Sequence, residues 1–177
     1  MREAILFRRD KDLETVAERL ISMFYPEFEG EVEIAVVMRS DNFTGKPRRL
    51  AQIEKLVGFK AWLFKSSRVA PYDERFTDPG AVFIIQIVEP RFERLSAEQK
   101  IAVIDHELAH ISINETSGDL TVDAEHDIEE FSSIARRHGL YHEGLMIFAE
   151  AIEQGVENYS QRDEIKNRIL EGVDFEL

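Results

Sequence analysis

The segment that most constrains the fold is a continuous apolar run over residues 81–88, which is followed at Ser96 by a strong helix start. The run has the length and the β-branched content of a strand that is buried on both faces. Ser96 and Gln99 have the spacing of a capping box, in which each side chain binds the backbone N–H of the other residue. We therefore predict a buried strand that leads into a helix over residues 97–113.

Weaker patterns predict the other elements of the chain. We predict helices over residues 12–24, 124–138 and 143–158, and strands over residues 31–38 and 56–66. From about residue 143 onward the chain is rich in Asp and Glu, which is typical of a solvated helix and tail. The order of one helix, then strands, then helices indicates an α+β domain. In this domain a small mixed sheet packs against the 97–113 helix and the helices that follow. A chain of 177 residues is expected to form a single domain over residues 1–177.

Composition excludes several classes of site. The sequence contains no cysteine, so disulfides, thiolate zinc ribbons and cysteine nucleophiles are excluded. Asp and Glu outnumber Lys and Arg by 35 to 22, which argues against general nucleic-acid binding. The first ten residues lack the apolar core of a signal peptide, and no apolar stretch approaches the roughly 20 residues of a membrane helix. We therefore expect a cytoplasmic protein with no membrane partner.

His106, Glu107 and His110 form an H-E-x-x-H motif on the predicted 97–113 helix. Residues four apart lie one above the other on a helix, so both imidazoles can reach one metal ion. In the absence of cysteine, a zinc site has to use His, Asp or Glu ligands. Glu107 lies beside the two histidines, where its carboxylate can accept a proton from a water molecule that zinc has acidified. The motif therefore predicts a hydrolytic zinc site in which Glu107 is the general base.

Catalytic zinc usually has three protein ligands, so a third must come from elsewhere in the chain. His126 is the preferred candidate, because it opens the next predicted helix and that helix can fold back over the metal. Glu129 and Glu130 lie one turn further on. Either is an alternative ligand, a residue that holds a ligand imidazole in place, or part of a solvated helix face. Asp105 precedes the first histidine, and it either supports a ligand or is simply exposed.

Three segments carry a resemblance to a known family: residues 102–110, 126–131 and 136–140. In these segments the chain resembles the putative phage metallopeptidase family, which looks like a branch of the SprT-like zinc peptidases. The resemblance spans about residues 15–142. It implies a zincin-like fold, a protein or peptide substrate, and a phage or prophage origin. It also implies that Glu107 is the general base and that the zinc ligands are His106, His110 and His126.

The segment from Arg39 to Arg68 is basic, although the whole chain carries a net charge of −13. The segment contains eight basic and two acidic residues. One interpretation is a surface for an acidic peptide or for nucleic acid, and the other is a strand edge that Lys and Arg keep soluble. The candidate patch residues are Lys46, Arg48, Arg49 and Lys55.

Two functions from different classes remain open on the sequence. The first is zinc-dependent hydrolysis of peptide bonds. The second is a non-enzymatic acidic inhibitor or binding protein, either a DNA mimic or a binder of a host protein, in which zinc only supports the fold. Glu107 distinguishes the two, because a structural zinc site has no use for this carboxylate and needs a fourth protein ligand.

Overall fold

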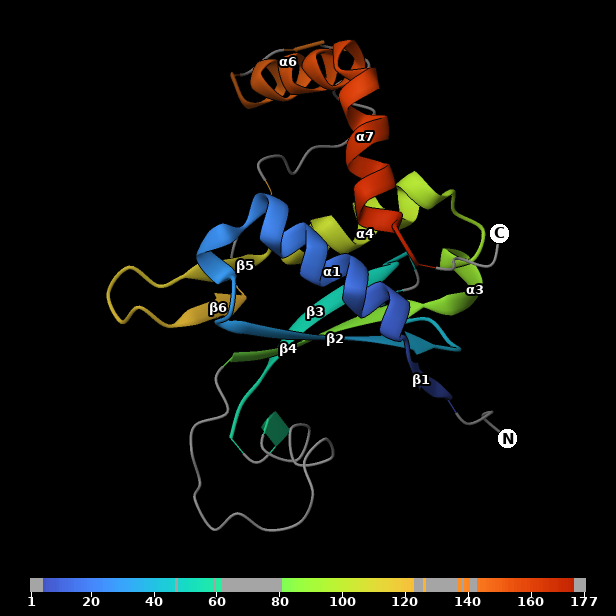
Figure 1. The fold of residues 1–177 in the computed structure, drawn as a ribbon, viewed down its shortest axis with the longest axis vertical. Helices are drawn as coiled ribbons and strands as arrows, with labels where there is room; N and C mark the ends of the chain where they lie inside the picture. The colour runs from blue at the N-terminus through green and yellow to red at the C-terminus, as the bar shows by residue number, and fades with distance from the viewer. Residues whose placement is uncertain are drawn as a thin grey trace. The chain divides into compact units, whose positions relative to one another are not determined.

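A computed structural model describes residues 5–46, 48–58, 60–61, 81–122, 126, 137, 139–140 and 143–173 of the chain (Figure 1). Two compact units are present. The first comprises Met1–Asp123 with Ile169–Leu177, and the second comprises Ala124–Arg168. The first unit combines a mixed sheet with helices, which confirms the predicted α+β class. The expectation of a single domain stays a prediction.

The first unit is built on a four-stranded mixed sheet. β2 and β4 run parallel, whereas β1 pairs antiparallel with β2 and β3 pairs antiparallel with β4. β4 is an interior strand, which confirms the predicted strand. Phe83, Ile85 and Ile87 are fully buried on one face, whereas the other face is buried at Val82 and Val88 and half-buried at Ile84 and Gln86. Burial on both faces is therefore confirmed only in part. The sheet order is β1-β2-β4-β3, and the strands are β1 (Phe7–Arg9), β2 (Val32–Arg39), β3 (Ala51–Leu56) and β4 (Ala81–Val88).

The first long helix, α1 (Lys11–Phe24), confirms the predicted 12–24 helix and packs on β2 (Figure 1). The Asp10 side chain caps it by accepting a hydrogen bond from the backbone N–H of Leu13, at 3.1 Å. A short 3-10 turn, η1 (Pro26–Phe28), follows α1 and leads into β2. A second short helix, α3 (Glu89–Phe92), follows β4 directly.

The motif helix is α4 (Ala97–Leu108), which packs on α1 and on β3 (Figure 1). Its predicted capping box is present, with both reciprocal bonds between Ser96 and Gln99. Ile104 and Leu108 turn inward and are fully buried. The cap therefore fixes where α4 begins, and the buried side chains fix which face it turns toward the sheet.

The prediction that the motif helix continues to residue 113 is wrong. α4 ends at Leu108, and β5 (Ile111–Ile113) pairs antiparallel with β6 (Leu120–Val122) to form a hairpin. Ile111 fits the apolar stripe of a longer helix, and it fits the start of a strand equally well. Local spacing cannot separate these two outcomes, because the pairing with β6 decides between them.

The predicted 56–66 strand is also wrong beyond Leu56, over the described residues 57–58 and 60–61. β3 covers Ala51–Leu56, and residues 60–61 are helical, while residues 62–66 lie outside the described part of the chain. The β3 sequence contains Gln, Glu and Lys, so its apolar content gives little strand signal. Its six residues are held by antiparallel pairing with β4, which is a long-range contact.

The second unit contains α6 (Glu143–Glu157), which confirms the predicted 143–158 helix. This helix has no Lys or Arg, and several of its large apolar side chains are exposed: Met146, Ile147, Phe148, Ile152 and Val156. The predicted 124–138 helix lies outside the described residues, apart from 126 and 137.

The last helix, α7 (Tyr159–Leu170), ends with residues that belong to the first unit. There Ile169 is buried, and its carbonyl oxygen accepts a hydrogen bond from Nη1 of Arg19 at 2.6 Å. The end of α7 is thus held in the core of the first unit. Among the described helices, none has the length and apolar character that crossing a membrane requires.

Candidate metal centre

The two motif histidines lie at the end of α4 and in the turn that follows it. Ala109, the C-cap residue, has φ −62° and ψ −16°, and its N–H bonds to the carbonyl of Asp105. The N–H of His110 bonds to the carbonyl of Glu107 at 3.3 Å. The chain therefore keeps helical curvature through His110, so the four-residue spacing still places both imidazoles together. The two rings meet edge to face, with their centroids 5.1 Å apart.

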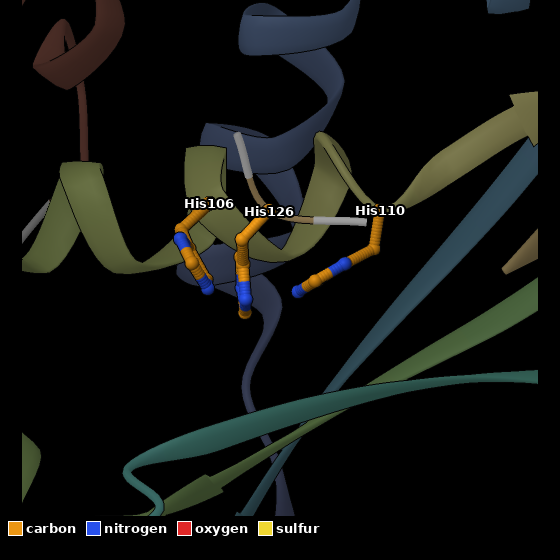
Figure 2. A group of neighbouring side chains, drawn as sticks. All are labelled: His106, His110 and His126. Atoms are coloured by element: carbon orange, nitrogen blue, oxygen red, sulfur yellow. The ribbon is translucent and has the colours of Figure 1, made fainter. Parts of the chain in front are cut away.

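His126 completes a group of three imidazoles. One ligand nitrogen from each of His106, His110 and His126 lies within 4.8 Å of the other two (Figure 2). Figure 2 shows the three rings on the same side of α4, with ring nitrogens facing one another. His110 is half-buried and the other two are exposed, so the group is open to solvent. The three histidines that the sequence predicts as ligands therefore lie together in the structure.

The donor set of this group fits zinc. Imidazole nitrogen is one of the preferred donors of Zn²⁺, and three such donors leave one tetrahedral position free. A structural zinc site has four protein ligands, whereas within the described residues no Asp, Glu or further His joins this group. Within the described residues the group therefore offers three ligand nitrogens.

Glu107 lies beside this group but is directed into the protein, where only 5% of it is exposed. Burial raises the pKa of its carboxyl. Electrostatic interactions with His110 and Arg49 and a backbone hydrogen bond from Ile53 act in the opposite direction without cancelling the rise. The result is a carboxylate that binds a proton more readily than an exposed glutamate does.

The contact with Ile53 follows from the register of β3. The backbone N–H of Val88 bonds to the carbonyl of Leu50 at 2.9 Å, so this antiparallel pair is a hydrogen-bonded one. Hydrogen-bonded and non-hydrogen-bonded pairs alternate along an antiparallel ladder. Three residues further on, the N–H of Ile53 therefore points away from β4, to the outer edge of the sheet. Glu107 binds at that edge, which joins α4 to β3 at the motif.

Asp105 is held away from the histidine group by a residue that the sequence did not single out. Its carboxylate accepts a hydrogen bond from the Tyr25 hydroxyl at 2.8 Å, and the ring of Tyr25 stacks on Phe28. Burial, together with the charge and hydrogen bond of Asp105, raises the pKa of Tyr25 well above its usual value. The only sequence signal for this contact is an aromatic residue just after the 12–24 helix.

The predicted basic patch is divided by the structure. Lys46, Arg48 and Arg49 are exposed on the loop before β3, whereas Nζ of Lys55 donates to the carbonyl of Leu120 in β6. Arg91 of α3, which the sequence did not single out, donates from Nη1 and Nη2 to the carbonyls of Arg49 and Arg48, each at 3.0 Å. The alternative ligands Glu129 and Glu130 lie outside the described residues.

Comparison with known proteins gives one match. No curated protein and no solved structure matches the chain. A family model described as "putative phage metallopeptidase" matches residues 6–159, a span that contains the whole sheet, α4 and the three histidines. Since this span is most of the 177 residues, the chain belongs to the putative phage metallopeptidase family.

Proposed function

We propose that this protein is a zinc-dependent peptidase with a zincin-like, SprT-like active site. In this proposal His106, His110 and His126 hold zinc, and Glu107 is the general base. The observation that carries it is the approach of three imidazole nitrogens to within 4.8 Å of one another beside a buried glutamate. Family membership and the open three-ligand donor set support the same function. The substrate is a protein or a peptide.

Zinc and Glu107 have different roles in the proposed hydrolysis. When bound, zinc supplies a Lewis acid that polarises a carbonyl and acidifies water. Glu107 accepts a proton from the attacking water as the water oxygen bonds to the carbonyl carbon. It then gives that proton to the amide nitrogen as the C–N bond breaks.

Zinc analysis of the purified protein tests the metal part of this proposal. The parent protein is expected to carry about one zinc per chain, as three protein ligands predict. His126→Ala is expected to lose most of it, whereas His138→Ala and His142→Ala should keep it. Full zinc in His126→Ala, with loss in Glu129→Ala or Glu130→Ala, would instead assign the third ligand to a carboxylate.

A cleavage assay distinguishes the peptidase from the rival function, an acidic binding protein with a structural zinc. A zinc-loaded sample is incubated with denatured casein and with a mixed peptide library, and new amino termini are measured. Zinc-dependent cleavage that disappears with a chelator and returns with added zinc supports the peptidase. Full zinc occupancy with no cleavage of any substrate in either set, and no dependence of any biological effect on Glu107, favours the binding protein.

A further inference from the structure

Three arginines gather at the loop before β3, and we call Arg48, Arg49 and Arg91 the arginine cluster. The Arg91 guanidinium binds the backbone carbonyls of Arg48 and Arg49 in a bidentate manner, at 3.0 Å each. The cluster therefore joins α3 to the loop before β3 through backbone contacts. This arrangement holds the exposed side chains of Arg48 and Arg49 close to a third positive charge.

The loop that presents Arg48 and Arg49 is fixed at its far end as well. Phe43 is buried, and the guanidinium carbon of Arg39 lies 4.3 Å from the centre of its ring. The N–H of Lys46 bonds to the carbonyl of Phe43 at 3.0 Å, and the N–H of Arg49 bonds to the carbonyl of Lys46 at 3.1 Å. A loop anchored in this way loses little conformational freedom when its side chains bind a ligand.

Arg49 is directed along β3 toward the motif. Its Nη1 donates to Oε1 of Gln52 at 3.2 Å, and the next residue, Ile53, is the one whose backbone binds Glu107. The hydrogen bond to Gln52 and the contact of the next residue with Glu107 therefore place Arg49 beside the segment of β3 that contacts the motif.

Two acidic residues on the neighbouring elements lie close to other cations. Glu89, which begins α3, binds the Arg8 guanidinium at 2.6 Å, and Glu54 of β3 lies 3.9 Å from Nζ of Lys60. Within the described ranges no ion pair to Arg49 is found. In a chain of net charge −13, the loop beside the motif is thus locally positive.

We propose that the arginine cluster selects acidic peptides, with Arg49 binding a carboxylate of the substrate close to the scissile bond. This proposal rests on the proposed peptidase function and names its substrate class. A peptide that reaches Glu107 places its neighbouring side chains within reach of Arg49, and guanidinium binds carboxylate in a planar, two-bond geometry. Nucleic acid is the less favoured partner, because three arginines neutralise few phosphates and the rest of the chain repels them.

Direct binding tests this selection without turnover. Zinc-loaded Glu107→Gln protein is titrated with three labelled peptides of one length, built from Ala with Asp, Asn or Lys at alternate positions, and fluorescence anisotropy is followed. We expect the Asp peptide to bind best and Arg49→Gln to weaken it about threefold to fivefold, the scale of an exposed ion pair. The Asn peptide should change by less than about twofold in the same variant, because it carries no charge for Arg49 to bind.

Charge reversal makes the test sharper. Arg49→Glu should reverse the order of the Asp and Lys peptides, which a purely structural role of Arg49 would not do. Arg168→Gln, which removes an exposed cation from α7, is the matched control and should leave the order unchanged. In the active protein Arg49→Gln should raise KM for the Asp peptide more than for the Asn peptide.

The outcomes separate this inference from the proposed activity. Cleavage and binding that are indifferent to peptide charge would overturn the arginine cluster as a selector and leave the peptidase standing. Asp-peptide binding that depends on Arg49, in a protein that cleaves nothing, would sustain the acidic-ligand surface and reject the peptidase. Binding of a duplex oligonucleotide that is lost in Arg49→Gln, with all three peptides bound alike, would reassign the cluster to nucleic acid and overturn the proposal.

Discussion

Two glutamates of the first unit are buried to the same extent and behave in opposite ways. Glu14 of α1 is 4% exposed, and Glu107 of α4 is 5% exposed. Burial alone would raise the pKa of Glu14, yet hydrogen bonds and charges from Arg9 and Lys11 bring it below its usual value. The backbone N–H of Val36 also donates to its carboxylate. Glu14 is thus a fully partnered anion that joins α1 to β1 and β2.

Glu107 has weaker compensation for the same burial. Among the described residues its partners are a backbone N–H and the neighbouring His110 and Arg49, and together they fail to offset the cost of desolvation. The comparison teaches that burial alone does not set the pKa of a carboxyl in this fold. Charged hydrogen-bond donors hold Glu14 as a structural anion, whereas the described partners of Glu107 leave its pKa raised.

The largest expected effect is on turnover. Glu107→Gln keeps the size of the side chain and removes its basicity, so we expect kcat to fall by a factor of roughly 10² or more. Zinc content should stay at the parent level, because Glu107 is not a proposed ligand. In the metal-free protein the melting temperature should equal or exceed that of the parent, since a buried, poorly compensated charge has been removed. Peptide cleavage, zinc analysis and thermal melting are measured on one preparation.

Glu14→Gln is the matched control for this substitution. It makes the same chemical change at an equally buried site, so the folded variant should keep kcat within about twofold. If the two variants lose turnover to a similar degree, the contrast between the two glutamates does not hold. In that case the effect of Glu107→Gln would reflect a general loss of structure.

The second largest expected effect is on the free energy of unfolding. Here Glu14→Gln should have a larger effect than Glu107→Gln. Glu14→Gln leaves the Arg9 guanidinium and the Lys11 amine without their common anion. We expect the free energy of unfolding to fall by about 2 kcal/mol, below the full cost of breaking a deeply buried pair because both cations are partly solvated. Urea unfolding at neutral pH measures this value, and a loss no larger than that of Glu107→Gln would contradict it.

The pH dependence of stability gives a smaller, signed effect. The pKa of Glu14 is lower in the folded protein than in the unfolded chain, so protons favour unfolding. Its contribution is complete above the unfolded pKa of about 4.3 and is lost as the pH falls through the folded value. The gap in unfolding free energy between the parent and Glu14→Gln should therefore be constant from neutral pH to about 5 and should shrink below about 4. A gap that widens on acidification would contradict the sign.

These contrasts also show what the sequence could reveal. Ser96 is predictable as a helix cap because capping depends on neighbours within four residues. The strand over residues 81–88 was recognised because a run this apolar has to be buried. The proximity of His106, His110 and His126 was predicted from chemistry, since the motif required a third ligand and His126 was the best-placed histidine.

The features that the sequence did not predict depend on contacts between residues that are far apart in the chain. The three-residue β1 is too short to give a pattern, and α4 stops early because β5 pairs with β6. The sequence could not assign Arg91 to the basic residues of the 48–49 loop, because it contacts backbone carbonyls that lie more than forty residues away along the chain. The opposite roles of Glu14 and Glu107 are likewise invisible in the sequence, because Arg9, Val36 and Ile53 become their neighbours only after folding.

The smallest expected effect concerns Asp105, which shares features with both Glu14 and Glu107. It adjoins the proposed ligand His106, as Glu107 does, yet it is bound by a neutral donor, the Tyr25 hydroxyl at 2.8 Å. Tyr25→Phe removes that donor, and we expect the free energy of unfolding to fall by about 1 kcal/mol, the usual net value of one hydrogen bond. Because the capping box and the buried Ile104 hold α4 independently, zinc affinity should change by less than about threefold. Competition with a chromogenic zinc chelator measures that affinity. A tenfold or greater loss of zinc affinity would show that Tyr25 and Asp105 orient the zinc ligands. Asp105 would then support the proposed active site together with Glu107, and would not be a purely structural carboxylate like Glu14.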